Sequence, residues 1–159
     1  MVPEWGRLIH ADARDFLGWE PVRESPLYQP NITDTRGVDV PIIEEVVDLP
    51  VDEGEMAVFT YREDDDVARP AIVLLHDAHG LIRGTLDIAR GLASQGFVVS
   101  APDTFHRAGR MMTDESGPAA QDGMLLRKNM TNDGHLSDMN RLAAHLKSQA
   151  YVSGDAVGV

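Results

Sequence analysis

The stretch from Ala71 to Ala101 constrains the fold of this chain more than any other. Residues 71–75 form an unbroken aliphatic run, which is typical of a strand buried on both faces. A polar turn follows, and residues 82–95 then carry apolar side chains at a near-helical spacing, with Gly96 where a glycine often ends a helix. Phe97 to Ala101 reads as a second buried strand. Because a helical crossover joins parallel strands, the sequence predicts the α/β class.

Segments on either side of this unit complete a predicted sheet between helices. Residues 42–50 and 55–62 are joined by a short turn that contains Gly54, and this arrangement predicts an antiparallel pair. Parallel strands need helices on both faces, so we expect the two helices on opposite faces of one sheet. The predicted elements are strands at 42–50, 55–62, 70–76 and 97–101 and helices at 82–95 and 133–149.

The later helix has one predicted apolar face, and Asn132 or Asp133 is its predicted cap. That face consists of Leu136, Met139, Leu142, Ala143 and Leu146. A turn is expected at 151–155, after which Ala156 to Val159 begins another apolar run. The sequence therefore predicts that a further strand starts at Ala156.

Composition predicts a single soluble domain and excludes several function classes. The chain has 159 residues, of which 43% are hydrophobic, and a formal net charge of −12, which argues against nucleic-acid binding. It has no cysteine, so disulfides, thiolate metal sites and a cysteine nucleophile are excluded within these residues. No apolar run has the length of a membrane span or of a signal-peptide core. We expect a cytoplasmic protein with no membrane partner.

The chain divides into an N-terminal arm, residues 1–37, and a domain, residues 38–159. The isolated aromatic residues Trp5, Phe16, Trp19 and Tyr28 favour docking of the arm on the domain, since such rings are large apolar groups to leave in water. The proline-containing composition is equally compatible with a partly disordered leader.

Two motifs resemble those of the dienelactone hydrolase family of the α/β-hydrolases: VLLHDAHGL at 73–81 and APDTFHR at 101–107. The order of predicted elements from about residue 40 to Val159 is also similar. This resemblance implies a three-layer sandwich with a mostly parallel sheet and an antiparallel first pair. It implies a carboxylic ester or lactone hydrolase that works by nucleophilic acyl transfer with an oxyanion hole. The implied substrate is a small ester or lactone, in some members carboxylate-bearing, and no cofactor is expected.

The resemblance assigns roles to three residues. Ala78 matches the position whose backbone N–H enters the oxyanion hole, although an ordinary strand-to-helix turn would look the same. Asp77 matches an acidic residue beside the nucleophile; alternatively it is a carboxylate at a helix N-terminus, stabilised by the helix dipole. Arg107 matches an arginine that holds a substrate carboxylate, or else it forms a surface ion pair with Asp103 or Glu115.

Histidines near the motifs do not predict a metal site. His76, His79 and His106 are nitrogen donors, but their spacing matches no common zinc motif. We expect His76 to end its strand and bond to backbone. The acidic run 63–66 lacks the spacing of a calcium loop and is expected to be solvated.

A nucleophile elbow is absent from these residues. In the family it follows the strand that here begins at Ala156, as Gly-x-Cys-x-Gly or Gly-x-Ser-x-Gly, and no serine here lies in such a motif. The acid and histidine of the triad come later still in family order. The sequence therefore resembles the N-terminal half of a hydrolase domain, ending before the nucleophile elbow. The alternative is a non-catalytic module that completes its sheet with a partner chain.

Either hypothesis leaves one edge of the sheet open. Residues 71–75 and 156–159 would then be poorly covered, and exposed strand edges pair readily with other chains. We therefore expect self-association through this edge.

Overall fold

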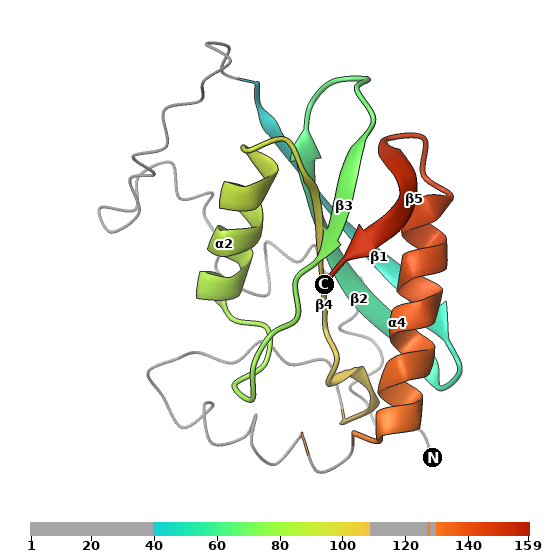
Figure 1. Cartoon of the computed structure of the whole chain (residues 1–159). Coiled ribbons are helices and arrows are strands. Elements are labelled where there is room, and N and C mark those ends of the chain that lie inside the picture. The colour runs from blue at the N-terminus through green and yellow to red at the C-terminus, as the bar shows by residue number, and fades with distance from the viewer. Residues whose placement is uncertain (1–39, 109–126, 128–129) are drawn as a thin grey trace. The chain divides into compact units, whose positions relative to one another are not determined.

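The structure, a computed structural model, describes residues 40–108, 127 and 130–159 (Figure 1). The predicted arm at 1–37 and the boundary after it lie outside the described residues. The described elements are β1 (Ile42–Val51), β2 (Gly54–Glu63), β3 (Arg69–Val73), α2 (Arg83–Ala93), β4 (Val98–Pro102), a 3-10 turn (His106–Ala108), α4 (Asn132–Lys147) and β5 (Val152–Gly158).

Within the described residues the strands form one five-stranded mixed sheet in the order β1-β2-β4-β3-β5. β1 pairs with β2 and β2 with β4 in antiparallel register, whereas β3 pairs in parallel with both β4 and β5. The predicted antiparallel opening pair and the predicted parallel pair are both confirmed. This arrangement is an α/β-hydrolase-like fold, as the sequence predicted.

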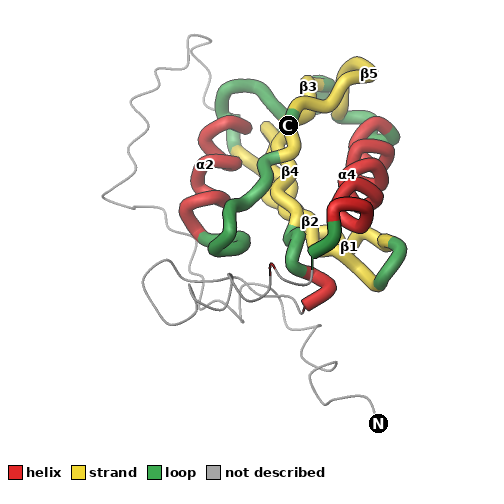
Figure 2. Tube along the Cα trace, turned by 60° about the horizontal axis from the view of Figure 1, so that its bottom comes forward, coloured by secondary structure: helices red, strands yellow, loops and turns green. Residues whose placement is uncertain are grey.

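The two helices cover opposite faces of the sheet, as predicted (Figures 1 and 2). Side chains of α2 pack into one core and side chains of α4 into the other, and successive residues of β2 alternate between the two. The α4 core contains Leu49, Met56, Val58, Ala71, Val73, Val98, Leu142 and Leu146. The α2 core contains Ala57, Phe59, Tyr61, Leu81, Ala89, Ala93, Val99 and Ala101. Between them, β2 and β4 are joined by a buried hydroxyl pair, Thr60 Oγ1 to Ser100 Oγ at 2.8 Å.

Gly96 ends α2 as predicted. It follows the C-cap Ser94 with φ of +88°, a left-handed conformation that glycine adopts without steric cost, and its N–H donates to the Ala93 carbonyl at 2.9 Å. The chain then turns directly into β4.

Two details of α4 differ from the prediction. Its N-cap is Thr131, whose hydroxyl accepts the Gly134 N–H at 3.1 Å, rather than Asn132 or Asp133. Leu136, predicted to face the core, is 61% exposed, and Asp138 is buried instead. The buried face of α4 therefore runs through Asp138, Leu142 and Leu146 at four-residue spacing.

Strand ends also differ from the prediction. β3 ends at Val73 rather than at residue 76, so the polar turn begins earlier. β5 begins at Val152 rather than at Ala156, because an irregularity in its pairing with β3 accommodates the predicted turn residues within the strand. Ala71 and Val73, predicted to be poorly covered, are buried under α4 beside β5, whereas Val159 is exposed.

A buried ion cluster joins the end of β2 to the start of β3. Arg69 Nη2 lies 2.5 Å from Glu63 Oε2, and its Nη1 lies 2.5 Å from Asp65 Oδ1 and donates to the Val67 carbonyl at 2.8 Å. Arg69 and Glu63 are both buried. The acidic run 63–66, expected to be solvated, is therefore partly used to neutralise this arginine and to close the loop before β3.

We predict that Arg69→Ala lowers the free energy of unfolding by about 3 kcal/mol, because it leaves the buried Glu63 carboxylate without its guanidinium. Urea unfolding measures the change. Arg141→Ala is the matched control: its ion pair with Asp52 is about half exposed, so its loss should lower the free energy of unfolding much less. Equal effects of the two substitutions would contradict a structural role for the buried cluster.

Candidate functional site

A pocket of about 340 Å³ lies beyond the carboxyl ends of β3 and β4. This is the end of parallel strands at which open α/β sheets bind ligands. The pocket is lined by Leu75, His76, Asp77, Ala78, Thr104, Phe105, Arg127, Met130 and His135. The structure thus brings the predicted residues Asp77 and Ala78 together in one concave site.

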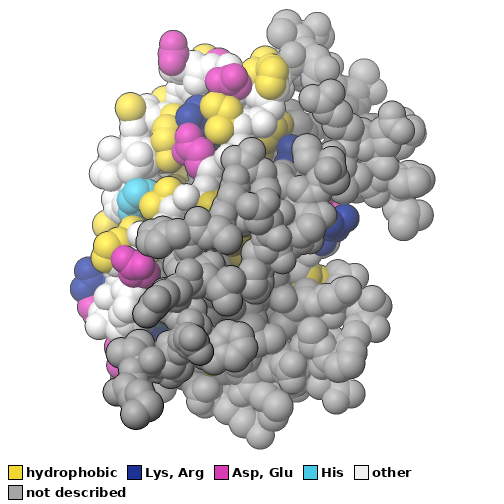
Figure 3. Space-filling model, turned by 180° about the vertical axis from the view of Figure 1, so that it is seen from behind, with side chains coloured by type: hydrophobic (Ala, Val, Ile, Leu, Met, Phe, Trp, Pro, Cys, Tyr) yellow, Lys and Arg dark blue, Asp and Glu magenta, His cyan; other side chains and the backbone are white. Residues whose placement is uncertain are grey.

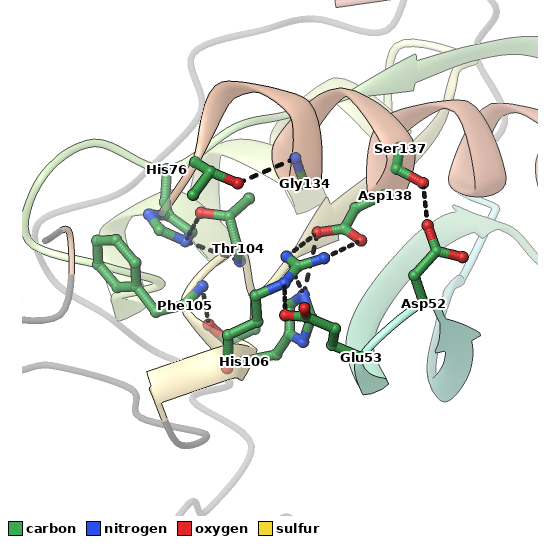
Figure 4. Close-up of polar contacts among 12 residues, drawn as sticks. Asp52, Glu53, His76, Thr104, Phe105, His106, Gly134, Ser137 and Asp138 are labelled. Atoms are coloured by element: carbon green, nitrogen blue, oxygen red, sulfur yellow. Dashed lines mark hydrogen bonds and ion pairs between the residues drawn. The ribbon is translucent and has the colours of Figure 1, made fainter. Parts of the chain in front are cut away.

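His76 connects two of the segments that line this pocket, the turn after β3 and the segment after β4 (Figure 4). Its Nε2 accepts the Thr104 N–H at 3.1 Å and lies 2.8 Å from the Thr104 hydroxyl. The ring proton is therefore on Nδ1, which donates to the Asp77 carbonyl at 2.8 Å. The ring also packs edge-on against Phe105, with centroids 4.7 Å apart. The expectation that His76 bonds to backbone is confirmed.

Asp77 organises the tight turn after β3. Its Oδ1 accepts the His79 N–H at 2.8 Å, and both carboxylate oxygens lie 3.1 Å from His79 Nδ1. The turn closes where the Gly80 N–H donates to the Asp77 carbonyl at 3.2 Å, with Gly80 at φ of +89°. The His79 backbone N–H, followed by its side chain, holds the pKa of Asp77 below its ordinary value.

Asp77 does not stabilise a helix N-terminus. α2 begins at Arg83 after the N-cap Ile82, and its first turn contains no acidic residue. The helix-dipole interpretation of Asp77 is therefore wrong. Placement of Asp77 beside a nucleophile stays a prediction.

Ala78 is half-buried and lines the pocket. Among the residues that the structure describes, none accepts a hydrogen bond from the Ala78 N–H. A backbone N–H without a described acceptor, in a small residue that lines a pocket at the end of a parallel strand, has properties that an oxyanion hole requires. The oxyanion role stays a prediction that this geometry supports.

Arg107 is directed away from the pocket lining and into an internal ion pair. Its Nη1 and Nη2 lie 2.5 and 3.0 Å from the two carboxylate oxygens of Asp138, and its Nε donates to Glu53 Oε2 at 2.8 Å. The predicted pair with Asp103 does not form, and Asp103 Oδ1 accepts the Phe105 N–H at 3.0 Å instead. The other predicted partner, Glu115, lies outside the described residues, so that pairing stays a prediction. Asp138 and Glu53 together engage three of the five N–H donors of Arg107, which anchors this side chain in the fold rather than on the pocket lining.

Asp138 is the anchor of this network and is buried on α4. His106 Nε2 also lies 3.0 Å from Asp138 Oδ2, and both side chains are 2% exposed (Figure 4). Burial raises the pKa of Asp138, but hydrogen bonds from Arg107 and His106 outweigh it, so the pKa lies below its ordinary value. The network fixes the segment after β4 against α4 and, through Glu53, against the β1–β2 turn.

We predict that Asp138→Asn destabilises the fold by about 3 kcal/mol near neutral pH, since it removes one charge of a buried pair. The folded pKa of Asp138 is depressed, so the carboxylate contributes fully above the unfolded value of 3.8, and the contribution is lost as pH falls through the lower folded value. The difference between the urea midpoints of the two proteins should therefore be constant from pH 7 to about pH 5 and begin to narrow as the pH falls below 3.8.

Asp52→Asn supplies the control for that measurement. The pKa of Asp52 is also lowered, by hydrogen bonds from Ser137 and Arg141, but this carboxylate is exposed. Its substitution should change the midpoints little at any pH. A constant difference between wild type and Asp138→Asn down to pH 3 would show that the destabilisation is not electrostatic.

Several residues of the pocket carried no sequence signal. Arg127, Met130 and His135 belong to α4 or to the residues just before it, and only the fold brings them to the segments after β3 and β4. Asp138 did carry a signal that the sequence reasoning missed, because a carboxylate four residues before Leu142 interrupts the apolar face.

Other kinds of site find no support in the described part of the chain. No three His, Cys, Asp or Glu side chains there are placed to hold a metal ion, and no helix there is long and apolar enough to cross a membrane. On the face seen in Figure 3, the visible basic side chains are scattered among acidic and hydrophobic ones. A phosphate backbone is usually bound by clustered basic residues, and no such cluster is visible among the described side chains on this face.

Comparison with known proteins first identifies the fold class. A proposed dienelactone hydrolase from Klebsiella pneumoniae is 18% identical with a TM-score of 0.61, and the match covers 74% of this chain and 48% of that one. A dienelactone hydrolase-like promiscuous phosphotriesterase from metagenomic libraries is 20% identical with a TM-score of 0.56, covering 73% and 47%. At this identity the likeness shows an α/β-hydrolase fold, and the chain spans about half the length of these structures.

A family model then identifies the family. The model of the dienelactone hydrolase family matches residues 55–159, so the chain belongs to that family. The resemblance inferred from the two motifs is confirmed. The search against curated proteins finds no match.

Proposed function

We propose that this chain supplies the oxyanion-binding part of a cytoplasmic hydrolase that acts on small carboxylic esters or lactones. The observation that carries the proposal is the Ala78 N–H, which has no acceptor among the described residues and belongs to a pocket at the carboxyl ends of β3 and β4. Membership of the dienelactone hydrolase family supports the same reaction class.

The proposed chemistry is acyl transfer. A nucleophile adds to the ester carbonyl, negative charge develops on the carbonyl oxygen, and the Ala78 N–H donates to that oxygen more strongly than to the neutral carbonyl. Collapse of the tetrahedral intermediate expels the alcohol, and water then releases the acid. The second donor of such a site follows the nucleophile in sequence. No nucleophile elbow occurs in these residues, so the proposal assigns the nucleophile, acid and histidine to residues outside them.

Two charged groups in the pocket have proposed roles. Asp77 lines the pocket, and its lowered pKa keeps it ionised near neutral pH. We assign it control of the protonation of the nucleophile, as the family resemblance implies. Arg127 lines the pocket, whereas Arg107 is engaged by Asp138. A substrate carboxylate would therefore meet Arg127 before Arg107, although the family resemblance assigns that role to Arg107.

A second candidate function is a non-catalytic module that completes its sheet with another chain. The observation in its favour is β5, which pairs with β3 along one edge and, within the described residues, with no strand along the other. Unpaired strand edges are templates for association. Activity measurements separate the two candidates.

We predict that residues 1–159 alone do not hydrolyse an activated aryl ester such as p-nitrophenyl acetate above background. The product of the complete reading frame should turn it over. In that product Ala78→Pro, which removes the N–H, should lower kcat by about a hundredfold or more, whereas Ala78→Gly keeps the donor and serves as the control. Turnover by the 159 residues that is lost on changing one serine would show that a nucleophile lies among them. A complete product that is inactive would favour the non-catalytic module.

We predict that the 159-residue chain self-associates through β5. Sedimentation equilibrium should give a weight-average mass that rises with concentration from the monomer value of 17.4 kDa. Thermal unfolding followed by near-UV circular dichroism should be concentration-dependent for the same reason. A monomeric mass at all concentrations, with a cooperative and concentration-independent transition, would show that the sheet is stable without pairing of its free β5 edge.

A further inference from the structure

The Asp77–Ala78 peptide group is held by side-chain and backbone donors on its carbonyl side. The Asp77 carbonyl accepts from His76 Nδ1 at 2.8 Å and from the Gly80 N–H at 3.2 Å. The Ala78 N–H belongs to the same planar peptide group and points to the side opposite that carbonyl. Whatever fixes the direction of the Asp77 carbonyl therefore fixes the direction of the Ala78 N–H.

His76 can fix that direction because its own ring is held at two further places. Its Nε2 accepts the Thr104 N–H, and its ring contacts the Phe105 ring in an edge-to-face arrangement. Thr104 and Phe105 are themselves buried, and Asp103 caps the Phe105 N–H. The imidazole ring therefore links the two segments: Thr104 and Phe105 hold the ring, and the ring holds the Asp77–Ala78 peptide group.

The neutral tautomer is essential to this arrangement. The backbone N–H of Thr104 can only donate, so Nε2 must accept and Nδ1 must carry the ring proton. Because Nε2 accepts from Thr104, Nδ1 is the nitrogen that donates to the Asp77 carbonyl. A donor on the carbonyl also polarises the peptide group, which strengthens the N–H at its other end.

We propose that His76 is a positioning residue for the oxyanion donor: through its Nδ1–H it orients the Asp77–Ala78 peptide group and so aims the Ala78 N–H. This inference rests on the proposed function for its catalytic meaning, but the orientation itself is a property of the described residues. His76 does not touch the reacting atoms in this proposal. It acts only through the peptide group that it holds.

Two substitutions separate the two ends of the imidazole. His76→Asn places an amide nitrogen near the former Nδ1 and keeps a donor for the Asp77 carbonyl, but it loses the acceptor for Thr104. His76→Gln reaches the former Nε2 position and can keep an acceptor for the Thr104 N–H, but it loses the donor to Asp77. Each variant is thus the matched control of the other.

The first experiment is NMR on the deuterated 159-residue chain, for which transverse-relaxation-optimised spectra tolerate a dimer. Long-range ¹H–¹⁵N correlation of the wild-type imidazole should show the proton on Nδ1. In His76→Asn the Ala78 amide should keep the chemical shift and the order parameter of the wild type, whereas in His76→Gln both should change. The Thr104 amide should change in His76→Asn and stay the same in His76→Gln. A wild-type proton on Nε2, or an Ala78 amide that is the same in both variants, would overturn the proposal even where one variant fails to fold.

The second experiment uses the complete hydrolase and p-nitrophenyl acetate. His76→Gln should lower kcat by about a hundredfold with KM nearly unchanged, because a misaimed donor is felt most in the transition state. His76→Asn should recover most of that loss. An equal loss of kcat in both variants would show that His76 acts only as a structural tie. If the Ala78 amide responds as expected and the wild-type product is inactive, the proposed function fails while the positioning of the peptide group stands.

Discussion

The parallel pairing of β3 with β4 is the constraint on which the candidate site depends. Ala71, Ile72 and Val73 lie opposite Val98, Val99 and Ser100, so both strands end at the same edge of the sheet. The polar turn after β3 and the segment after β4 are 28 residues apart at His76 and Thr104, and this pairing brings them into hydrogen-bonding contact. The crossover through α2 makes the arrangement possible, since only a crossover of that length returns the chain parallel.

The segment after β4 is then fixed from two sides. On one side His76 accepts from Thr104, and on the other Asp138 of α4 binds Arg107 and His106. A buried ion pair is costly to desolvate and contributes little net stability compared with apolar packing, so stability alone does not explain Asp138 on the buried face of α4. The effect of Asp138 on geometry is clearer. Its bonds to His106 and Arg107 hold α4 against the segment after β4, and Thr104 and Phe105 of that segment line the pocket.

Sequence reasoning succeeded where the signal is local and failed where the partner is distant. The strands, both helices and the end of α2 at Gly96 follow from apolar periodicity and turn residues, which act over a few positions. The placement of Asp77 and Ala78 in the pocket followed from a motif at a strand end. The partner of Arg107 did not follow, because Asp138 lies 31 residues away and only the packing of α4 brings it near. The early start of β5 was missed for a similar reason, since an irregular pairing with β3 absorbs residues that locally read as a turn.

The roles of Arg107 and His76 are linked through this geometry. If Arg107 left Asp138 to bind a substrate carboxylate, a buried carboxylate would lose its main counter-charge, and the segment that carries Thr104 would lose one of its two supports. In the proposed hydrolase the Ala78 N–H depends on Thr104 through His76, so it would then be aimed less well at the oxygen on which charge develops. An arginine that stays paired with Asp138 avoids that conflict. Arg127 lies on the pocket lining and outside this network, and for that reason the proposed function assigns a charged substrate to Arg127 rather than to Arg107.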